Sequence, residues 1–186
     1  VLNDHLFYVD SERGICLLDA DQIIPIPQLS TLLNGRRMVM TVAGPHQILV
    51  GRTTGDFKLI DFAQQWNAQT KRYVFDANSA PIVSNFPTEI DHLLDEDHAY
   101  MYKLLSLGND QFAISSVRAG VMIFNRQGKL LRVINKNSGL QDNTGAGIMQ
   151  DRDGNLWAAT NSGISHVELA APQSQFGTRN GLEGIS

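Results

Sequence analysis

The sequence predicts an all-β fold: about four four-stranded antiparallel β-propeller blades, forming part of a larger ring of the seven-bladed type. Glycines that end polar corners recur at intervals of 41, 65 and 43 residues, at Gly14, Gly55, Gly120 and Gly163. A second marker, Asn137-Ser-Gly-Leu140, returns 42 residues later as Arg179-Asn-Gly-Leu182. A period of roughly 40 to 45 residues is typical of a blade with four short strands, so both markers indicate the same architecture.

The clearest copy of the repeat runs from Ile148 to Val167. It reads as a strand, an Asp153-Gly154 hairpin turn, an apolar strand around Trp157, a polar corner ending at Gly163 and a third strand. Glycine suits such a corner because it adopts a positive φ without strain. Large apolar residues are expected at near-equivalent positions of the second strands, filling the faces between blades: Trp157, Phe112, Leu49 and Phe7.

The individual strands follow from the same pattern. Inner strands are predicted at Leu6–Val9, Ile15–Leu18, Met38–Ala43, Gln47–Arg52, Phe57–Phe62, Tyr102–Leu107, Gln111–Ser116 and Val121–Phe124. Outer fourth strands are expected where β-branched or aromatic runs suit a sheet edge, at Ile23–Ile26, Arg72–Phe75 and Leu130–Ile134. The predicted blades are residues 1–35, 36–76, 100–136 and 145–178, with the start of a further blade at 179–186.

Residues 77–99 are predicted to be an insertion between two blades. The segment contains two prolines and an acidic run, Asp91 to His98, that a plain blade does not need. Thr88 is expected to cap a short helix over Glu89–Asp95, because a hydroxyl before the first turn satisfies free backbone amides. A long loop inserted into a regular repeat is also a common place for function.

Composition and charge exclude several classes of partner. A chain with 42% hydrophobic residues can form a real core, which argues against disorder. The net charge of -4 and the lack of a Lys/Arg cluster argue against nucleic acid and anionic membrane surfaces. No apolar stretch reaches the roughly 18 residues of a membrane span. The single cysteine, Cys16, follows a glycine into an apolar strand and is interpreted as a core residue.

Three segments carry a family resemblance: Gly139-Leu140, Ile148 to Trp157, and Thr160 to Ile164. Together they resemble the two-component regulator propeller repeat, and Phe176 to Leu182 resembles the lead-in to the next copy. The resemblance implies a periplasmic sensor segment of a protein anchored in the bacterial inner membrane, which feeds a histidine kinase or a diguanylate cyclase. Membrane contact is then expected only through other parts of that protein.

Four blades are fewer than a closed propeller usually contains. We therefore expect the chain to be a fragment of a larger ring. Its partners are expected to be the remaining blades or a second copy of the chain, because open blade faces and edges seek such contacts.

Metal ligands and cofactors are not predicted. Asp151 to Asn155 begins like a calcium loop, but Ser162 occupies the twelfth position, where glutamate is needed, so a hairpin turn is favoured. His5 and His46 fall in separate turns, and His166 lies in another blade. His92 and His98, among acidic residues, form the best metal candidate, although a solvated acidic loop is the favoured interpretation.

The corner turns supply the candidate ligand-binding residues. In propellers, the turns between second and third strands meet at one mouth of the central channel. Arginine can pair with a carboxylate or a sulfated sugar, and Asn or Thr can bond hydroxyls, which favours an anionic carbohydrate or small metabolite. The alternative, that these are solvated turn residues, is slightly favoured. The residues concerned are Arg13, Arg52, Arg118, Thr160 and Asn161.

Catalysis is not predicted for this segment, because no nucleophile elbow, phosphate-binding glycine loop or zinc helix occurs in it. Two alternatives to a sensor stay open. The first is a propeller enzyme similar to streptogramin lyase, which the Asp-Gly-Asn-Leu-Trp segment also resembles; it requires histidines that converge at one mouth of the channel. The second is a purely structural interaction propeller without a ligand.

Overall fold

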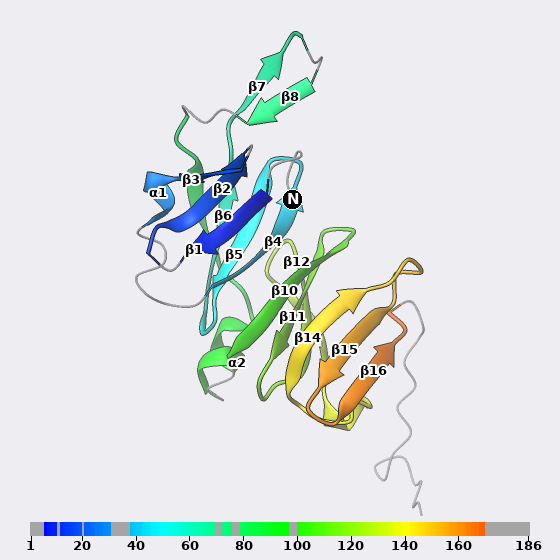
Figure 1. The fold of residues 1–186 in the computed structure, drawn as a ribbon. Coiled ribbons are helices and arrows are strands. Elements are labelled where there is room, and N and C mark those ends of the chain that lie inside the picture. The colour runs from blue at the N-terminus through cyan, green and yellow to red at the C-terminus, as the bar shows by residue number, and fades with distance from the viewer. Residues whose placement is uncertain are drawn as a thin grey trace, which may run out of the picture.

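A computed structural model of the chain describes residues 6–10, 12–19, 21–30, 38–69, 72–75, 79–96 and 100–169. In these residues the chain forms antiparallel sheets of three or four strands with very little helix (Figure 1). The all-β prediction is therefore confirmed. Within the same ranges, no helix has the length and apolar character needed to cross a membrane.

Four sheets follow one another along the chain. The first sheet contains β1 (Leu6–Asp10), β2 (Gly14–Asp19) and β3 (Gln22–Pro25). The second contains β4 (Met38–Gly44), β5 (Gln47–Arg52), β6 (Gly55–Asp61) and β9 (Ile82–Phe86). The third contains β10 (Met101–Gly108), β11 (Gln111–Ser116), β12 (Val121–Asn125) and β13 (Leu130–Ile134). The fourth contains β14 (Gly145–Gln150), β15 (Leu156–Thr160) and β16 (Gly163–Val167).

The sheets stack face to face in chain order, and each interface has its own apolar cluster (Figure 1). The cluster between the first and second sheets includes Phe7, Ile15, Leu17, Ile48, Val50 and Ile60. The cluster between the second and third includes Leu49, Phe57, Phe86, Phe112, Ile114 and Phe124. The cluster between the third and fourth includes Ala113, Val121, Ile123, Ile148, Leu156 and Ala158. This layered arrangement is that of consecutive propeller blades.

Side-chain alternation explains how one strand serves two interfaces. Successive side chains of a strand point to opposite faces, so Phe112 and Ile114 pack against the second sheet while Ala113 packs against the fourth. The Phe112 ring lies 5.5 Å from that of Phe124 and 6.3 Å from that of Phe86. Central strands are therefore apolar at consecutive positions instead of alternating with polar residues.

The predicted equivalence of the large second-strand residues is wrong for Phe112. Leu156 packs toward the third sheet, as Phe112 packs toward the second, whereas Trp157 points to the open face and is 40% exposed. The predicted alignment is offset by one residue, and an offset of one moves a strand side chain to the opposite face.

The corner glycines behave as predicted. Each lies at the turn into a strand with a positive φ: 86° at Gly14, 97° at Gly55, 77° at Gly120 and 134° at Gly163. The first three also lie close to the segment that follows the last strand of their own sheet. Their neighbours there are Leu29, Asp91 and Asn135 respectively. Glycine is needed there for conformation and, at Gly14 and Gly120, for space.

The first strands of the sheets lie next to one another. β10 contacts both β4 and β14, and the Ser106 amide donates a hydrogen bond to the Thr41 hydroxyl at 3.0 Å. In the second and third sheets, β9 and β13 form the edge remote from this contact. Such an order, with first strands inside and fourth strands outside, is the order in a propeller blade.

The fourth strand of the second sheet differs from the prediction. Arg72–Phe75 is a strand, β8, but it pairs with β7 (Gln64–Asn67) in a separate hairpin, which projects from the sheets in Figure 1. The position beside β6 is taken by β9, which comes from the predicted insertion; its Phe86 pairs with Phe57. The other blade boundaries remain predictions.

The insertion also contributes a helix, α2 (Asp91–Glu96), which begins two residues later than predicted. The Thr88 hydroxyl donates to the Asp91 carboxylate at 2.6 Å. Glu89 joins the β12–β13 turn, where its amide donates to the Gly128 carbonyl at 2.9 Å and its carboxylate accepts from the Leu130 amide at 2.8 Å. This part of the insertion therefore connects the second and third sheets.

The first sheet corresponds to strands two to four of a blade. Its short helix α1 (Pro27–Ser30) follows β3, just as α2 follows β9 and the 3-10 helix η1 (Lys136–Ser138) follows β13. Among the described residues, no strand pairs with β1 on the side away from β2, where the first strand of a blade would lie. The fourth sheet likewise shows three strands in the described part of the chain, where four were predicted.

Candidate functional site

The turns between second and third strands lie beside the first strand of the next sheet. The Thr53 carbonyl accepts a hydrogen bond from the Met101 amide of the next sheet at 2.8 Å. Within the third sheet, the Val117 amide donates to the Tyr100 carbonyl at 2.9 Å. The Gly120 amide donates to the Asn143 carbonyl at 2.8 Å. We call the β5–β6, β11–β12 and β15–β16 turns, together with residues 100–102, the rim.

Two tyrosines that were not among the predicted ligand-binding residues are exposed on the rim. Tyr100 and Tyr102 are each 52% exposed, whereas Met101 between them is buried. The pairing of β10 with β11 is irregular between Met101 and Lys103, so Tyr102 has no partner in the register. The Tyr-Met-Tyr alternation at the start of a strand was a usable signal, because alternate residues face opposite sides.

Arg118 belongs to the turn whose backbone is hydrogen-bonded to Tyr100. It is an exposed residue of the β11–β12 turn, directly after Val117, whose amide bonds the Tyr100 carbonyl. The turn is closed by the Ser116 hydroxyl, which accepts from the Ala119 amide at 3.0 Å. The structure therefore brings one predicted ligand residue and two exposed aromatic side chains to the same part of the rim.

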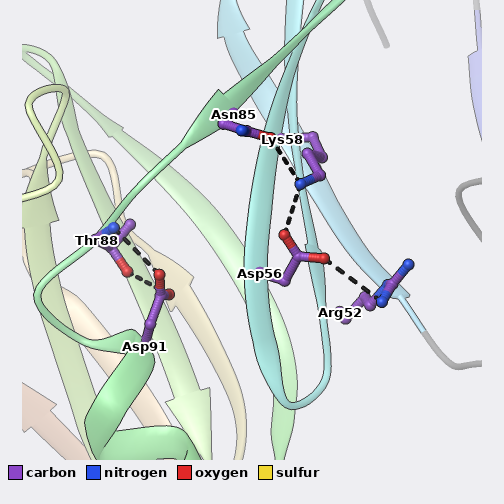
Figure 2. A network of polar contacts seen from close by, with 6 residues as sticks. All are labelled: Arg52, Asp56, Lys58, Asn85, Thr88 and Asp91. Carbon is purple, nitrogen blue, oxygen red and sulfur yellow. Dashed lines mark hydrogen bonds and ion pairs between the residues drawn. The ribbon is translucent and has the colours of Figure 1, made fainter.

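Arg52 is held by its own turn. Its guanidinium lies 3.5 Å from the Asp56 carboxylate, and Asp56 also accepts from the Lys58 ammonium at 2.7 Å (Figure 2). Lys58 in turn donates to the Asn85 side-chain oxygen at 2.8 Å, which ties β6 to β9. Arg52 is thus part of a network that stabilises the second sheet.

The predicted residues of the fourth sheet are also used within their turn. The Thr160 hydroxyl donates to the Gly163 carbonyl at 3.0 Å and accepts from the Ser162 amide at 3.3 Å. The Ser162 hydroxyl donates to the Asp142 carboxylate at 3.0 Å. The hydrogen bond from the Thr144 amide, with smaller ones, lowers the pKa of Asp142. Asn161 is exposed at the tip of this turn.

Arg13 lies on the corresponding turn of the first sheet, where it is exposed. The Asp10 carboxylate accepts from the Arg13 amide at 2.8 Å and from the Glu12 amide at 2.9 Å. These two backbone hydrogen bonds, that from Arg13 first, lower the pKa of Asp10. The predicted ligand residues therefore occupy equivalent turns of the four sheets, and their role in binding remains a prediction.

The histidines do not converge within the described residues. His46 pairs with Asp61 at 3.5 Å in the second sheet, and His166 pairs with Asp151 at 3.5 Å in the fourth. His92 is exposed on α2, while His5 and His98 lie outside the described residues. In the described ranges, no group of three His, Cys, Asp or Glu side chains is placed to hold a metal. Cys16 is fully buried in β2, as predicted for a core residue.

Asp151 organises a hairpin turn, as predicted. Its carboxylate accepts from the amides of Asp153 at 3.0 Å and Asn155 at 2.8 Å, and from the Trp157 indole at 2.9 Å. The indole hydrogen bond is the largest of the effects that lower the pKa of Asp151. The Trp157 and His166 rings lie 4.6 Å apart, centroid to centroid, so the indole is held on two sides.

A second polar cluster lies at the opposite end of the second and third sheets. Arg126, at the end of β12, donates to the Ala43 carbonyl and to the Gln47 side chain of the second sheet. Gln47 donates to Asp61 at 2.6 Å, and Arg126 also lies 3.6 Å from the Asp110 carboxylate. Because these groups bind one another across the interface, the cluster serves to join the sheets.

Comparison with known proteins identifies no family for this chain. No family model matches the chain, and no curated protein matches it. A solved structure that resembles it is the extracellular domain of a protein described as a hybrid two-component system of B. thetaiotaomicron, at 16% identity and a TM-score of 0.46. The match covers 91% of this chain and 26% of that one, so the chain spans about a quarter of its length. The fold therefore rests on the strand pairing and the three clusters.

Proposed function

We propose that this chain is a ligand-binding segment of an extracytoplasmic sensor propeller and that it carries no catalysis. One observation supports the binding role above the others. Tyr100 and Tyr102 are exposed beside the Arg118 turn, at the end of the stack where the turns between second and third strands lie. Aromatic faces pack against the apolar face of a sugar ring, and a guanidinium binds a carboxylate or sulfate with two hydrogen bonds.

The proposed ligand is a carbohydrate that carries an anionic group. Two rigid aromatic side chains offer contact area at a small entropic cost, and an arginine selects charge. Arg52 lies beside the Asp56 carboxylate, and the Thr160 hydroxyl donates to the Gly163 carbonyl. The sensor role and the extracytoplasmic location rest on the resemblance of residues 137–186 to the two-component regulator propeller repeat. The output domain and the membrane anchor belong to other parts of the proposed protein.

Calorimetric titration with a sulfated disaccharide and its unsulfated counterpart tests the proposal. Tyr102→Ala is expected to weaken binding of both sugars. Arg118→Gln is expected to weaken only the sulfated one, by about tenfold or more, because a hydrogen-bonded charge pair contributes about 1.5–3 kcal/mol. The matched control is Arg152→Gln, an exposed arginine on the β14–β15 turn. Equal losses in Arg118→Gln and Arg152→Gln, or no binding of either sugar, would contradict the proposed site.

A further inference from the structure

The outer edge of the second sheet is formed by β9 (Ile82–Phe86). This strand pairs with β6 on one side, and among the described residues no strand pairs with it on the other. The fourth strand of a blade lies on the outside of a propeller, so further blades before the first sheet or after the fourth would not cover this edge. The backbone amide and carbonyl groups along it are therefore open to a further strand.

β9 lacks the features that discourage such pairing in the other outer strands. β13 contains Arg132, and β3 is four residues long and ends in Pro25, which has no amide hydrogen. The five residues of β9, Ile-Val-Ser-Asn-Phe, include neither a charged residue nor a proline. Ile82 is 71% exposed and Val83 38%. An uncharged edge strand with exposed apolar residues is suited to strand addition.

Contacts within its own sheet hold β9 in place. The Lys58 ammonium donates to the Asn85 side-chain oxygen at 2.8 Å, and the Ser84 hydroxyl donates to the Leu59 carbonyl at 3.3 Å. Phe86 is buried in the cluster between the second and third sheets. Because the strand is already fixed, little backbone freedom is lost when another strand pairs with it.

Two prolines limit the registers in which another strand can add. Pro81 and Pro87 flank β9 and cannot donate to a ladder. A second β9 that runs antiparallel and is centred on Ser84 uses all five residues and leaves the prolines of both copies outside the ladder. It places Ile82 of each copy opposite Phe86 of the other, and no like charges meet. Any other antiparallel register between two copies leaves part of β9 unpaired or brings a proline into the ladder.

We propose that β9 binds β9 of a second copy of this chain by antiparallel strand addition centred on Ser84. The contact uses the same strand on both sides, so it closes as a symmetric dimer and does not grow further. The second sheets of the two copies then form one continuous sheet. β9 contains no residue of the rim, so this proposal does not depend on the ligand proposed there.

Disulfide cross-linking through one added cysteine tests the register. In the proposed dimer the two Ser84 residues are directly opposite, with Cα atoms about 4.5–5.5 Å apart, which suits a disulfide. The two Ile82 residues lie at opposite ends of the ladder, about 13 Å apart. Under copper-phenanthroline oxidation, Ser84→Cys is expected to form a linked dimer at least tenfold faster than Ile82→Cys. The native Cys16 is fully buried and is not expected to compete.

A charge on the edge tests strand addition itself. Val83→Lys, introduced into Ser84→Cys, is expected to slow cross-linking at least tenfold, because a lysine on an edge strand opposes pairing. The matched control is Leu131→Lys in the same background: Leu131 is 45% exposed on β13, the outer strand of the third sheet. The control is expected to cross-link as fast as Ser84→Cys alone. Cross-linking of Ser84→Cys no faster than that of Ile82→Cys, or equal rates for the two lysine variants, overturns the proposal.

Discussion

Gly120→Ala is expected to destabilise the protein far more than Gly139→Ala, although both glycines have a positive φ. The angles are 77° at Gly120 and 105° at Gly139, so either alanine adopts a left-handed backbone at a cost of about 1 kcal/mol. The two sites differ in space. A Cβ at Gly139 would meet nothing within 4 Å, whereas one at Gly120 would collide with the Ile134 carbonyl oxygen and lie 3.1 Å from the Asn135 Cα.

The collision determines how much more stability Gly120→Ala loses than Gly139→Ala. The atoms that a Cβ would meet at Gly120 are mainly backbone, so the corner or the end of β13 must shift, and overpacking of this kind costs about 1–3 kcal/mol. The hydrogen bond from the Gly120 amide to the Asn143 carbonyl would be strained by the same movement. We expect a total loss of about 3 kcal/mol for Gly120→Ala against about 1 kcal/mol for Gly139→Ala.

Urea unfolding followed by circular dichroism measures both variants against the parent chain. The slope of the unfolding free energy against urea concentration should be the same for both variants and the parent chain, because neither change alters the surface exposed on unfolding. If Gly120→Ala proves no less stable than Gly139→Ala, the corner does not lie against the end of β13. The physical reason given for the recurring glycine would then be wrong.

Two further changes test the polar contacts. Asp151→Asn should make the loss of stability in acid shallower: the lowered pKa of Asp151 means that its contribution is present above its ordinary pKa of about 4 and is lost as the pH falls below it. Melting temperatures between about pH 6 and pH 2 measure this, with the exposed neighbour Asp153→Asn as control, and an unchanged acid profile would contradict it. Arg126→Met should cost about 1–2 kcal/mol, because the Ala43 carbonyl and the Gln47 side chain lose their donor. Urea unfolding measures this loss, and a variant as stable as the parent would show that the contact does not join the sheets.

Strand positions were predictable because they depend on neighbours in the sequence. All predicted strands occur within two residues of their expected bounds. A turn forms at Asp153-Gly154, although it is longer than the two residues expected, because Gln150 and Leu156 are the last paired residues on either side. Hairpin turns need residues that tolerate a positive φ, and strands need β-branched and aromatic residues. Both can therefore be recognised from a few neighbouring residues in the sequence. The corner glycines, which have a positive φ, were predictable for the same reason.

Strand partners were harder to predict. Arg72–Phe75 and Ile82–Phe86 are both runs suited to a sheet edge, and nothing local shows which of them pairs with β6. β9 takes the place because Phe86 enters the cluster with Phe112 and Phe124, and because the segment after it bonds to the β12–β13 turn. Both contacts involve residues far away in the chain.

The candidate site was also predictable from the sequence only in part. The polar corners of the rim were visible as turn residues, including Arg118. That Asp56 holds Arg52, and that an irregular pairing leaves Tyr102 exposed, follow from the fold. Residue types and their period thus establish the strands, the turns and the repeat, because each depends on a few adjacent φ and ψ angles. The choice of strand partner, of buried face and of free side chain depends on packing between sheets, which brings together residues that no local pattern connects.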